Sequence, residues 1–156
     1  MDIEIGLSAK ARKGVAEILH AALADAHVLY IKTRKYHWDV SGRQFSELHP
    51  FLESQYKALE ESIDEIAERS LMIGIKSPGA MATFLKLARL KECTGAPDAL
   101  QMLANLKADH EAVVRQLRKD IDACTDDLKD AGTADFLTGI LEKHEKMAWM
   151  LRAHLS

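Results

Sequence analysis

Apolar residues recur at helical spacing along four long segments of this chain, and no segment shows the two-residue alternation of a half-buried strand. The four segments run approximately from Ser8 to Tyr36, Phe45 to Ile73, Pro97 to Cys124 and Thr133 to Leu155. Ser8 is a plausible N-cap for the first segment, and Gly74 a plausible end for the second. The pattern predicts four long helices whose apolar faces meet in one core.

The connections between the segments decide how these helices are arranged. Only residues 37–44 separate the first two segments, and Asp39 to Gly42 breaks the helix there, so the first two helices must run antiparallel. A longer stretch separates the second and third segments, and residues 80–89 (AMATFLKLAR) within it predict a short helix. That stretch can carry the chain across the bundle. The expected fold is all-α: a ferritin-like four-helix bundle with a short helix in this connection.

Size and charge exclude several classes of protein. The 156 residues suit one domain, 1–156, in which a short segment, 1–7, precedes the first helix. A formal net charge of −3 provides no general attraction to nucleic acid. No apolar run approaches the roughly 20 residues that span a bilayer, and the N-terminus lacks the apolar core of a secretory signal. Cys93 and Cys124 fit no metal-ligand spacing, so we expect inert thiols in a cytoplasmic protein.

Two histidines and two acids carry the metal chemistry that this sequence predicts. His37 closes the first helix and His49 follows the turn, so a tight hairpin brings the two together. Asp64 and Glu68 lie one turn apart on the second helix, with only acidic or apolar residues three or four positions away. Glu53 shares their side of the helix. Imidazole nitrogen and carboxylate oxygen together suit Fe(II), Zn(II) or Mn(II).

One chain cannot bring these residues onto one ion. His49 and Asp64 lie 15 residues apart on the same helix, which corresponds to about 22 Å along its axis. Bonds from a ligand to a metal are only about 2 Å long. The histidines and the acids must therefore form separate half-sites. The sequence predicts an oligomer in which the histidines of one subunit face the acids of another.

Two rival metal sites find little support. A di-iron site inside one bundle needs two Glu-x-x-His motifs; Glu17 and His20 supply one, and no second occurs. The H-E-x-x-H motif of zinc proteases is absent. We therefore interpret the remaining histidines as packed or surface residues: His20, His27, His110, His144 and His154.

The stretch KYHWDVSGRQFSELHPFLESQYKALEESIDEIAER, residues 35–69, resembles the signature region of the Dps family, mini-ferritins named as DNA-binding proteins from starved cells. In that family a histidine before Trp and a second histidine twelve positions later face an Asp-x-x-x-Glu pair across a two-fold interface. His37, His49, Asp64 and Glu68 match this pattern. Glu53 stands where the family usually has an assisting acid, commonly Asp. The similarity covers nearly the whole chain, including residues 133–155.

The resemblance implies a ferroxidase in a hollow, twelve-subunit shell. Fe(II), two ions per interface site, would be oxidised by hydrogen peroxide or O2 and stored as ferric mineral in the cavity, which would protect DNA from oxidative damage. His37 and His49 would hold Fe(II), while Asp64 bridges the metal positions. Glu68 and Glu53 would complete the coordination. Zinc and manganese compete for the same ligand types, and a shell whose interfaces hold structural zinc stays open.

The family also suggests roles for Trp38 and for acids near the fourth helix. Trp38 would lie beside the iron and intercept oxidising equivalents; the equal alternative is a core aromatic that closes the hairpin. An acidic channel at a three-fold axis admits iron in the family. Asp130, Asp135 and Glu142 are candidates for its lining, although a solvated helix face explains them as well.

DNA binding is where the chain departs from the family pattern. Many relatives hold DNA with a Lys-rich N-terminal tail, whereas about seven residues precede the first helix here. Because affinity without sequence preference depends on the number of phosphate contacts, we expect DNA binding to be weak or absent. The alternative function is a nucleoid-associated shell that shields DNA with little iron chemistry.

Overall fold

The computed structural model describes residues 3–156, and every regular element in this range is helical. The elements are α1 (Ala9–Asp39), α2 (Phe45–Met72), α3 (Met81–Leu87), α4 (Ala99–Asp122), the π-helical turn η1 (Ala123–Asp127) and α5 (Ala131–Leu155). The predicted all-α bundle, with a short helix between the second and third long helices, is confirmed.

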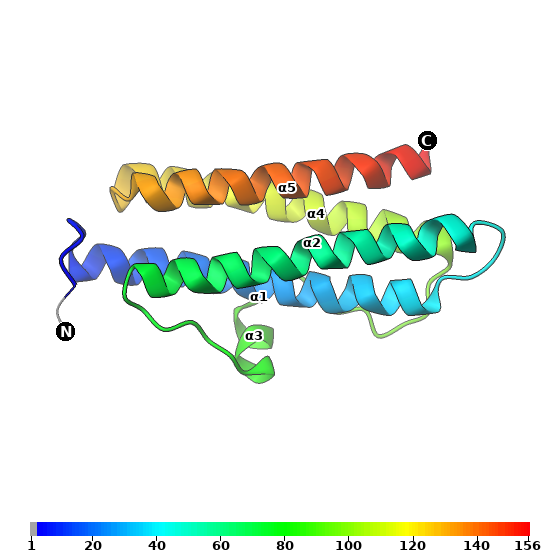
Figure 1. The fold of residues 1–156 in the computed structure, drawn as a ribbon, viewed down its shortest axis with the longest axis horizontal. Helices are drawn as coiled ribbons and strands as arrows, with labels where there is room; N and C mark the ends of the chain where they lie inside the picture. Colours follow the sequence, from blue (N-terminus) through cyan, green and yellow to red (C-terminus); the bar gives the residue numbers. More distant parts are fainter. Residues whose placement is uncertain (1–2) are drawn as a thin grey trace.

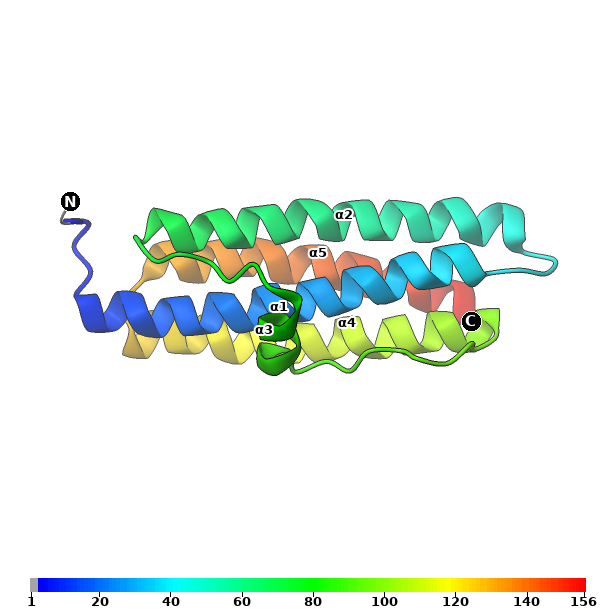
Figure 2. The same cartoon turned by 90° about the horizontal axis from the view of Figure 1, so that it is seen from below.

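The four long helices lie side by side as two antiparallel pairs, α1 with α2 and α4 with α5 (Figure 1). The chain leaves α2 at one end of the bundle and enters α4 at the other, so α1 and α5 run in the same direction. Figure 2 shows the long connection on the outside of the bundle, with α3 beside α1. This crossover is the one expected of a ferritin-like bundle.

Local signals fix several helix ends. The Ser8 side chain accepts a hydrogen bond from the Ala11 N–H at 3.1 Å and caps α1, as predicted. Gly74 follows α2 with φ of +80°. Its N–H donates to the Leu71 carbonyl and the Ile75 N–H donates to the Ser70 carbonyl. These two bonds satisfy carbonyls in the last turn of the helix. Glycine adopts the left-handed backbone conformation that this helix end requires, because it has no Cβ to clash.

Two other helix ends differ from the sequence prediction. Helix α4 ends at Asp122, and the helical chain continues past Cys124 as η1, which closes with a bond from the Leu128 N–H to the Ala123 carbonyl at 3.0 Å. Helix α5 begins at Ala131 rather than Thr133, because Asp130 is its N-cap. The periodicity of apolar residues cannot reveal either change, since both depend on individual hydrogen bonds.

The core divides into two apolar clusters along the bundle. One contains Leu19, Leu23, Ile66, Leu117 and Leu137, and the other contains Leu29, Leu52, Leu59, Leu106 and Leu151. Helix α1 is long and apolar enough to cross a membrane by length and composition alone, but 56% of the relevant window is buried inside the bundle. Its place in the core accounts for that composition.

An ion network with two buried carboxylates, Asp25 and Asp120, attaches the long connection to the bundle. The Arg89 side chain donates to Asp25 at 2.7 Å and to Asp120 at 3.1 Å, and so joins α1 to α4. The backbone N–H groups of Arg89 and Leu90 also donate to Asp25, at 2.6 and 3.1 Å. Three of these four bonds end on Asp25 and satisfy a carboxylate that is buried on an otherwise apolar face of α1.

Candidate metal centre

The α1–α2 hairpin brings the two predicted histidines into contact. His37 lies in the last turn of α1 and His49 in the first turns of α2. Gly42, with φ of +98°, provides the left-handed backbone in the turn between them. The two imidazole rings stack with their centroids 3.7 Å apart and an angle of 23° between their planes.

Reciprocal hydrogen bonds fix the orientation of both rings. His37 Nδ1 lies 2.7 Å from the His49 carbonyl oxygen, and His49 Nδ1 lies 2.8 Å from the His37 carbonyl oxygen. Because a carbonyl oxygen only accepts, each Nδ1 must carry the hydrogen and donate. In the neutral ring each Nε2 then keeps its lone pair. A histidine that ligates a metal usually has this arrangement, in which its other ring nitrogen donates to a carbonyl or carboxylate.

Glu53 lies one turn beyond His49 on α2. Its carboxylate pairs with Lys57 at 2.6 Å, and Lys57 is the main cause that lowers the pKa of Glu53. His37 and His49 lower this pKa further by smaller amounts. Glu53 is therefore an ionised carboxylate whose field reaches both imidazoles.

Asp64 and Glu68 form a separate acidic pair farther along α2. Both are exposed, and neither makes an ion pair within residues 3–156. The adjacent acid Glu65, by contrast, forms an ion pair with Lys143 at 2.5 Å. Within this range no group of three or more His, Cys, Asp or Glu side chains is placed to hold an ion. In one chain the histidines and the acids are thus two incomplete sets of ligands.

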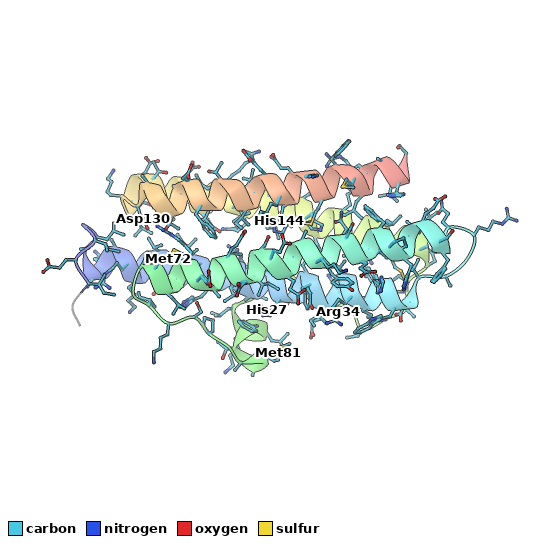
Figure 3. The ribbon with its side chains drawn as sticks, viewed as in Figure 1. His27, Arg34, Met72, Met81, Asp130 and His144 are labelled. Atoms are coloured by element: carbon cyan, nitrogen blue, oxygen red, sulfur yellow. The ribbon has the colours of Figure 1, made fainter. Side chains whose placement is uncertain are left out.

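Trp38 is exposed, at 63% of its accessible surface, so the alternative in which it closes the hairpin as a core aromatic is wrong. Tyr36 takes that place instead and is fully buried. The side chain of Arg34 lies over the Trp38 ring, with its Cζ 5.2 Å from the ring centroid. Figure 3 labels Arg34 in the half of α1 that leads to the hairpin.

The three acids proposed for an iron channel divide into two kinds. Asp130 is only 4% exposed; it accepts from the Thr133 N–H at 3.0 Å and pairs with Arg69. It is therefore a helix cap rather than a channel residue, which corrects the sequence prediction (Figure 3). Asp135 and Glu142 are exposed on α5.

The residues considered for other metal or redox sites do not come together in the described part of the chain. His20 contacts Ser70 at 3.0 Å, and Glu17 is exposed. His27 stacks on Phe84 with centroids 3.9 Å apart. Cys93 and Cys124 are both free. Burial, followed by nearby acids, raises the pKa of Cys124 to about 11, which keeps its thiol protonated and unreactive.

Sequence reasoning missed two clusters. Tyr30 and Tyr56 surround Arg34 together with Trp38; the four-residue spacing of Tyr30, Arg34 and Trp38 was a usable signal. His110 and His144 form a buried pair with their Nδ1 atoms 2.9 Å apart. Their apolar neighbours at helical spacing showed that both face the core, but not that they meet.

Comparison with known proteins assigns nearly the whole chain to one protein family. The ferritin-like domain family matches residues 16–156. An uncharacterized low temperature-induced protein of Nostoc sp. is 50% identical, over 98% of this chain and 86% of the relative. DNA protection during starvation protein 2 of Bacillus anthracis is 38% identical, over 92% of this chain and 98% of the relative.

A solved structure agrees with both sequence matches. The Dps protein of Vibrio cholerae O1, described as a ferritin-like diiron-carboxylate protein, superposes with a TM-score of 0.92. It is 31% identical, and the match covers 100% of this chain and 98% of the other.

Proposed function

Since the chain belongs to the Dps proteins of the ferritin-like domain family, we propose that it is a ferroxidase and an iron store. It oxidises Fe(II) with hydrogen peroxide or O2 at sites between subunits. It then retains ferric mineral inside a hollow homo-oligomeric shell, a dodecamer. Removing Fe(II) and peroxide together protects DNA from oxidative damage.

The observation that carries this proposal is the oriented histidine pair. Reciprocal bonds from Nδ1 to backbone carbonyls commit one nitrogen of each ring and leave both Nε2 atoms as ligands. Two stacked imidazoles are a partial ligand set for Fe(II). Glu53 lies close enough for its charge to act on both rings and supplies a third ligand.

The unpaired acids supply the remaining ligands from a second subunit. Asp64 bridges two Fe(II) positions and Glu68 completes the coordination. Like charges one turn apart destabilise an isolated helix by about 0.2–0.5 kcal/mol per pair, so a bound cation relieves a repulsion that the chain itself leaves in place. Zn(II) and Mn(II) compete for these ligands.

The redox step balances with two Fe(II) ions at one site. Each Fe(II) gives one electron to hydrogen peroxide, and the O–O bond breaks to give two hydroxides without releasing a hydroxyl radical. The exposed indole of Trp38 follows His37 in the chain and is accessible to intercept stray oxidising equivalents.

The first test removes the histidine half-site. Fe(II) is added anaerobically, then peroxide, while ferric absorbance and particle size are followed together. We expect His37→Ala with His49→Ala to lower oxidation to the rate in buffer. His20→Ala, which removes an imidazole at the other end of the bundle, should leave it unchanged. An unchanged rate in the double variant would contradict the proposal.

A second test asks whether one site takes ligands from two subunits. Subunits carrying His37→Ala and His49→Ala are refolded together with subunits carrying Asp64→Asn and Glu68→Gln. In an isologous two-fold interface, random pairing restores about a quarter of the sites. Mixed shells should regain activity in that proportion. If each site lies within one subunit, mixing restores nothing.

We also propose that DNA binding is weak. Lys10 and Lys13 are exposed on α1, whereas the Arg12 guanidinium donates to the Ile73 carbonyl at 3.3 Å. Few cations near the N-terminus remain for phosphate contacts. A gel shift that shows tight binding at physiological salt would overturn this.

A further inference from the structure

Arg34 is held by aromatic rings beside the histidine half-site. Its Cζ lies 5.4 Å from the ring centroid of Tyr30, 5.4 Å from that of Tyr56 and 5.2 Å from that of Trp38. Its Nη1 donates to the Tyr30 hydroxyl at 3.0 Å. Three rings and one hydrogen bond therefore fix a side chain that is ordinarily flexible.

This ordered guanidinium has no carboxylate partner in its own subunit. No ion pair involves Arg34 in the described part of the chain, and its Nε is buried there without a hydrogen-bond partner. Arginine has five N–H donors in a fork that matches a carboxylate. One subunit uses one of them.

The position of Arg34 links it to the proposed metal centre. It lies three residues before His37, on the same face of α1. Tyr56 contacts both groups, because its ring also meets the His37 ring at a centroid distance of 5.4 Å. Whatever surface approaches His37 therefore approaches the guanidinium too.

The surface around Arg34 and the two histidines has the composition of a protein interface. Trp38, Phe45 and Ile31 are large apolar residues that are exposed here. Exposed aromatic residues around an arginine are typical of the centre of an interface, where few residues supply most of the binding energy.

We propose that the Arg34 guanidinium pairs with the Asp64–Glu68 carboxylates of a second copy of this chain and holds the two-fold interface together before iron binds. The inference rests on the proposed function, which brings those acids of the partner subunit to His37 and His49. The charges are complementary: an unpaired cation faces a pair of unpaired anions. In the metal-free oligomer Arg34 supplies the positive charge that Fe(II) later adds.

The pairing predicts a weak interface in a variant that lacks this cation. Dissociation is followed by sedimentation on dilution, with a chelator present so that no metal contributes. Arg34→Gln should raise the subunit dissociation constant by about tenfold or more, as expected for an unpaired interfacial charge. Lys35→Gln is the matched control, because Lys35 is the next residue and pairs with Asp39 in its own chain. Equal dissociation constants for the two variants would overturn the inference.

A double-mutant cycle identifies the partner even if Arg34→Gln disturbs the aromatic cluster. Asp64→Asn with Glu68→Gln changes exposed side chains that make no ion pair in the described chain, so the fold should be unaffected. These changes should weaken the metal-free interface by a similar factor, and adding Arg34→Gln should weaken it little further. Fully multiplicative effects would disprove the pairing. Iron oxidation is measured separately, so failure here leaves the ferroxidase proposal standing.

Discussion

At the scale of single residues, two pairs of histidines differ in the atoms to which their Nδ1–H groups donate. His37 and His49 each donate Nδ1–H to a backbone carbonyl, which leaves Nε2 available to a metal. His110 and His144 instead share one hydrogen between their Nδ1 atoms, 2.9 Å apart. One ring must donate and the other accept, and burial, which lowers the pKa of both side chains, favours the neutral form of each. The first pair is suited to binding an ion and the second to packing inside the bundle.

The buried pair predicts a loss of stability in acid. Burial lowers the pKa of His144 from 6.5 to about 4, with a smaller effect from Lys143. His144 therefore becomes protonated near pH 6.5 in the unfolded chain, but only near pH 4 in the folded chain. Stability from this group is complete above pH 6.5 and falls towards pH 4. We expect a loss of about 3 kcal/mol in the free energy of unfolding, measured by denaturant titration across this range.

Other carboxylates also titrate in acid, so the prediction needs a variant without the pair. His110→Leu with His144→Leu replaces both rings by apolar side chains and leaves no unpaired nitrogen. The free energy of unfolding of this variant should depend less on pH between 6.5 and 4. An identical pH dependence would assign the acid loss to other groups.

At the scale of whole elements, Arg89 determines how the crossover connection lies on the bundle. Its guanidinium joins Asp25 on α1 to Asp120 on α4. Arg89→Met should cost about 3 kcal/mol or more, because it leaves buried carboxylates without their cation. Lys86→Met on the exposed side of α3 should change stability little. Chemical denaturation compares the two, and similar midpoints would contradict the role given to Arg89.

Helix ends show which parts of an element can be predicted from a sequence. Ser8 and Gly74 were identified correctly, since each works through bonds to residues within four positions. Asp130 was assigned to a channel although its capping bond from the Thr133 N–H spans only three positions. What no local pattern could reveal is its pairing with Arg69, which lies 61 residues earlier. Apolar periodicity identified the helices but could not place their caps wherever distant residues take part.

At the scale of the whole molecule, variants of Asp130, Asp135 and Glu142 can distinguish a role in stability from a role in iron entry. Asp135→Asn with Glu142→Gln should slow iron uptake by the shell without changing thermal stability, if these exposed acids line a channel. Asp130→Ala should do the reverse and cost about 1 kcal/mol, as the loss of an N-cap does. Uptake kinetics and thermal unfolding of both variants test this. An unchanged uptake rate in the double variant would remove the channel.

The order of helices, the antiparallel hairpin and the crossover could all be predicted from the sequence. The histidine pair could be predicted too, because a short turn permits one arrangement of His37 and His49. The cluster around Arg34 could not, since Tyr56 joins it from a different helix. Trp38 shows a second limit: periodicity locates the buried face in mid-helix, but at the last turn it did not tell an exposed indole from a core one.

The reciprocal bonds in the hairpin mean that His37 and His49 lose side-chain conformational entropy when the chain folds, before any metal binds. Each imidazole is anchored to the backbone beside the other, so folding alone restricts both side chains. An arriving ion meets two nitrogens that are already immobilised, and the rotamer entropy that metal binding ordinarily costs is reduced. A dissociated subunit keeps the same geometry. Under the proposed function, assembly therefore adds ligands to two imidazoles that each folded chain has already oriented.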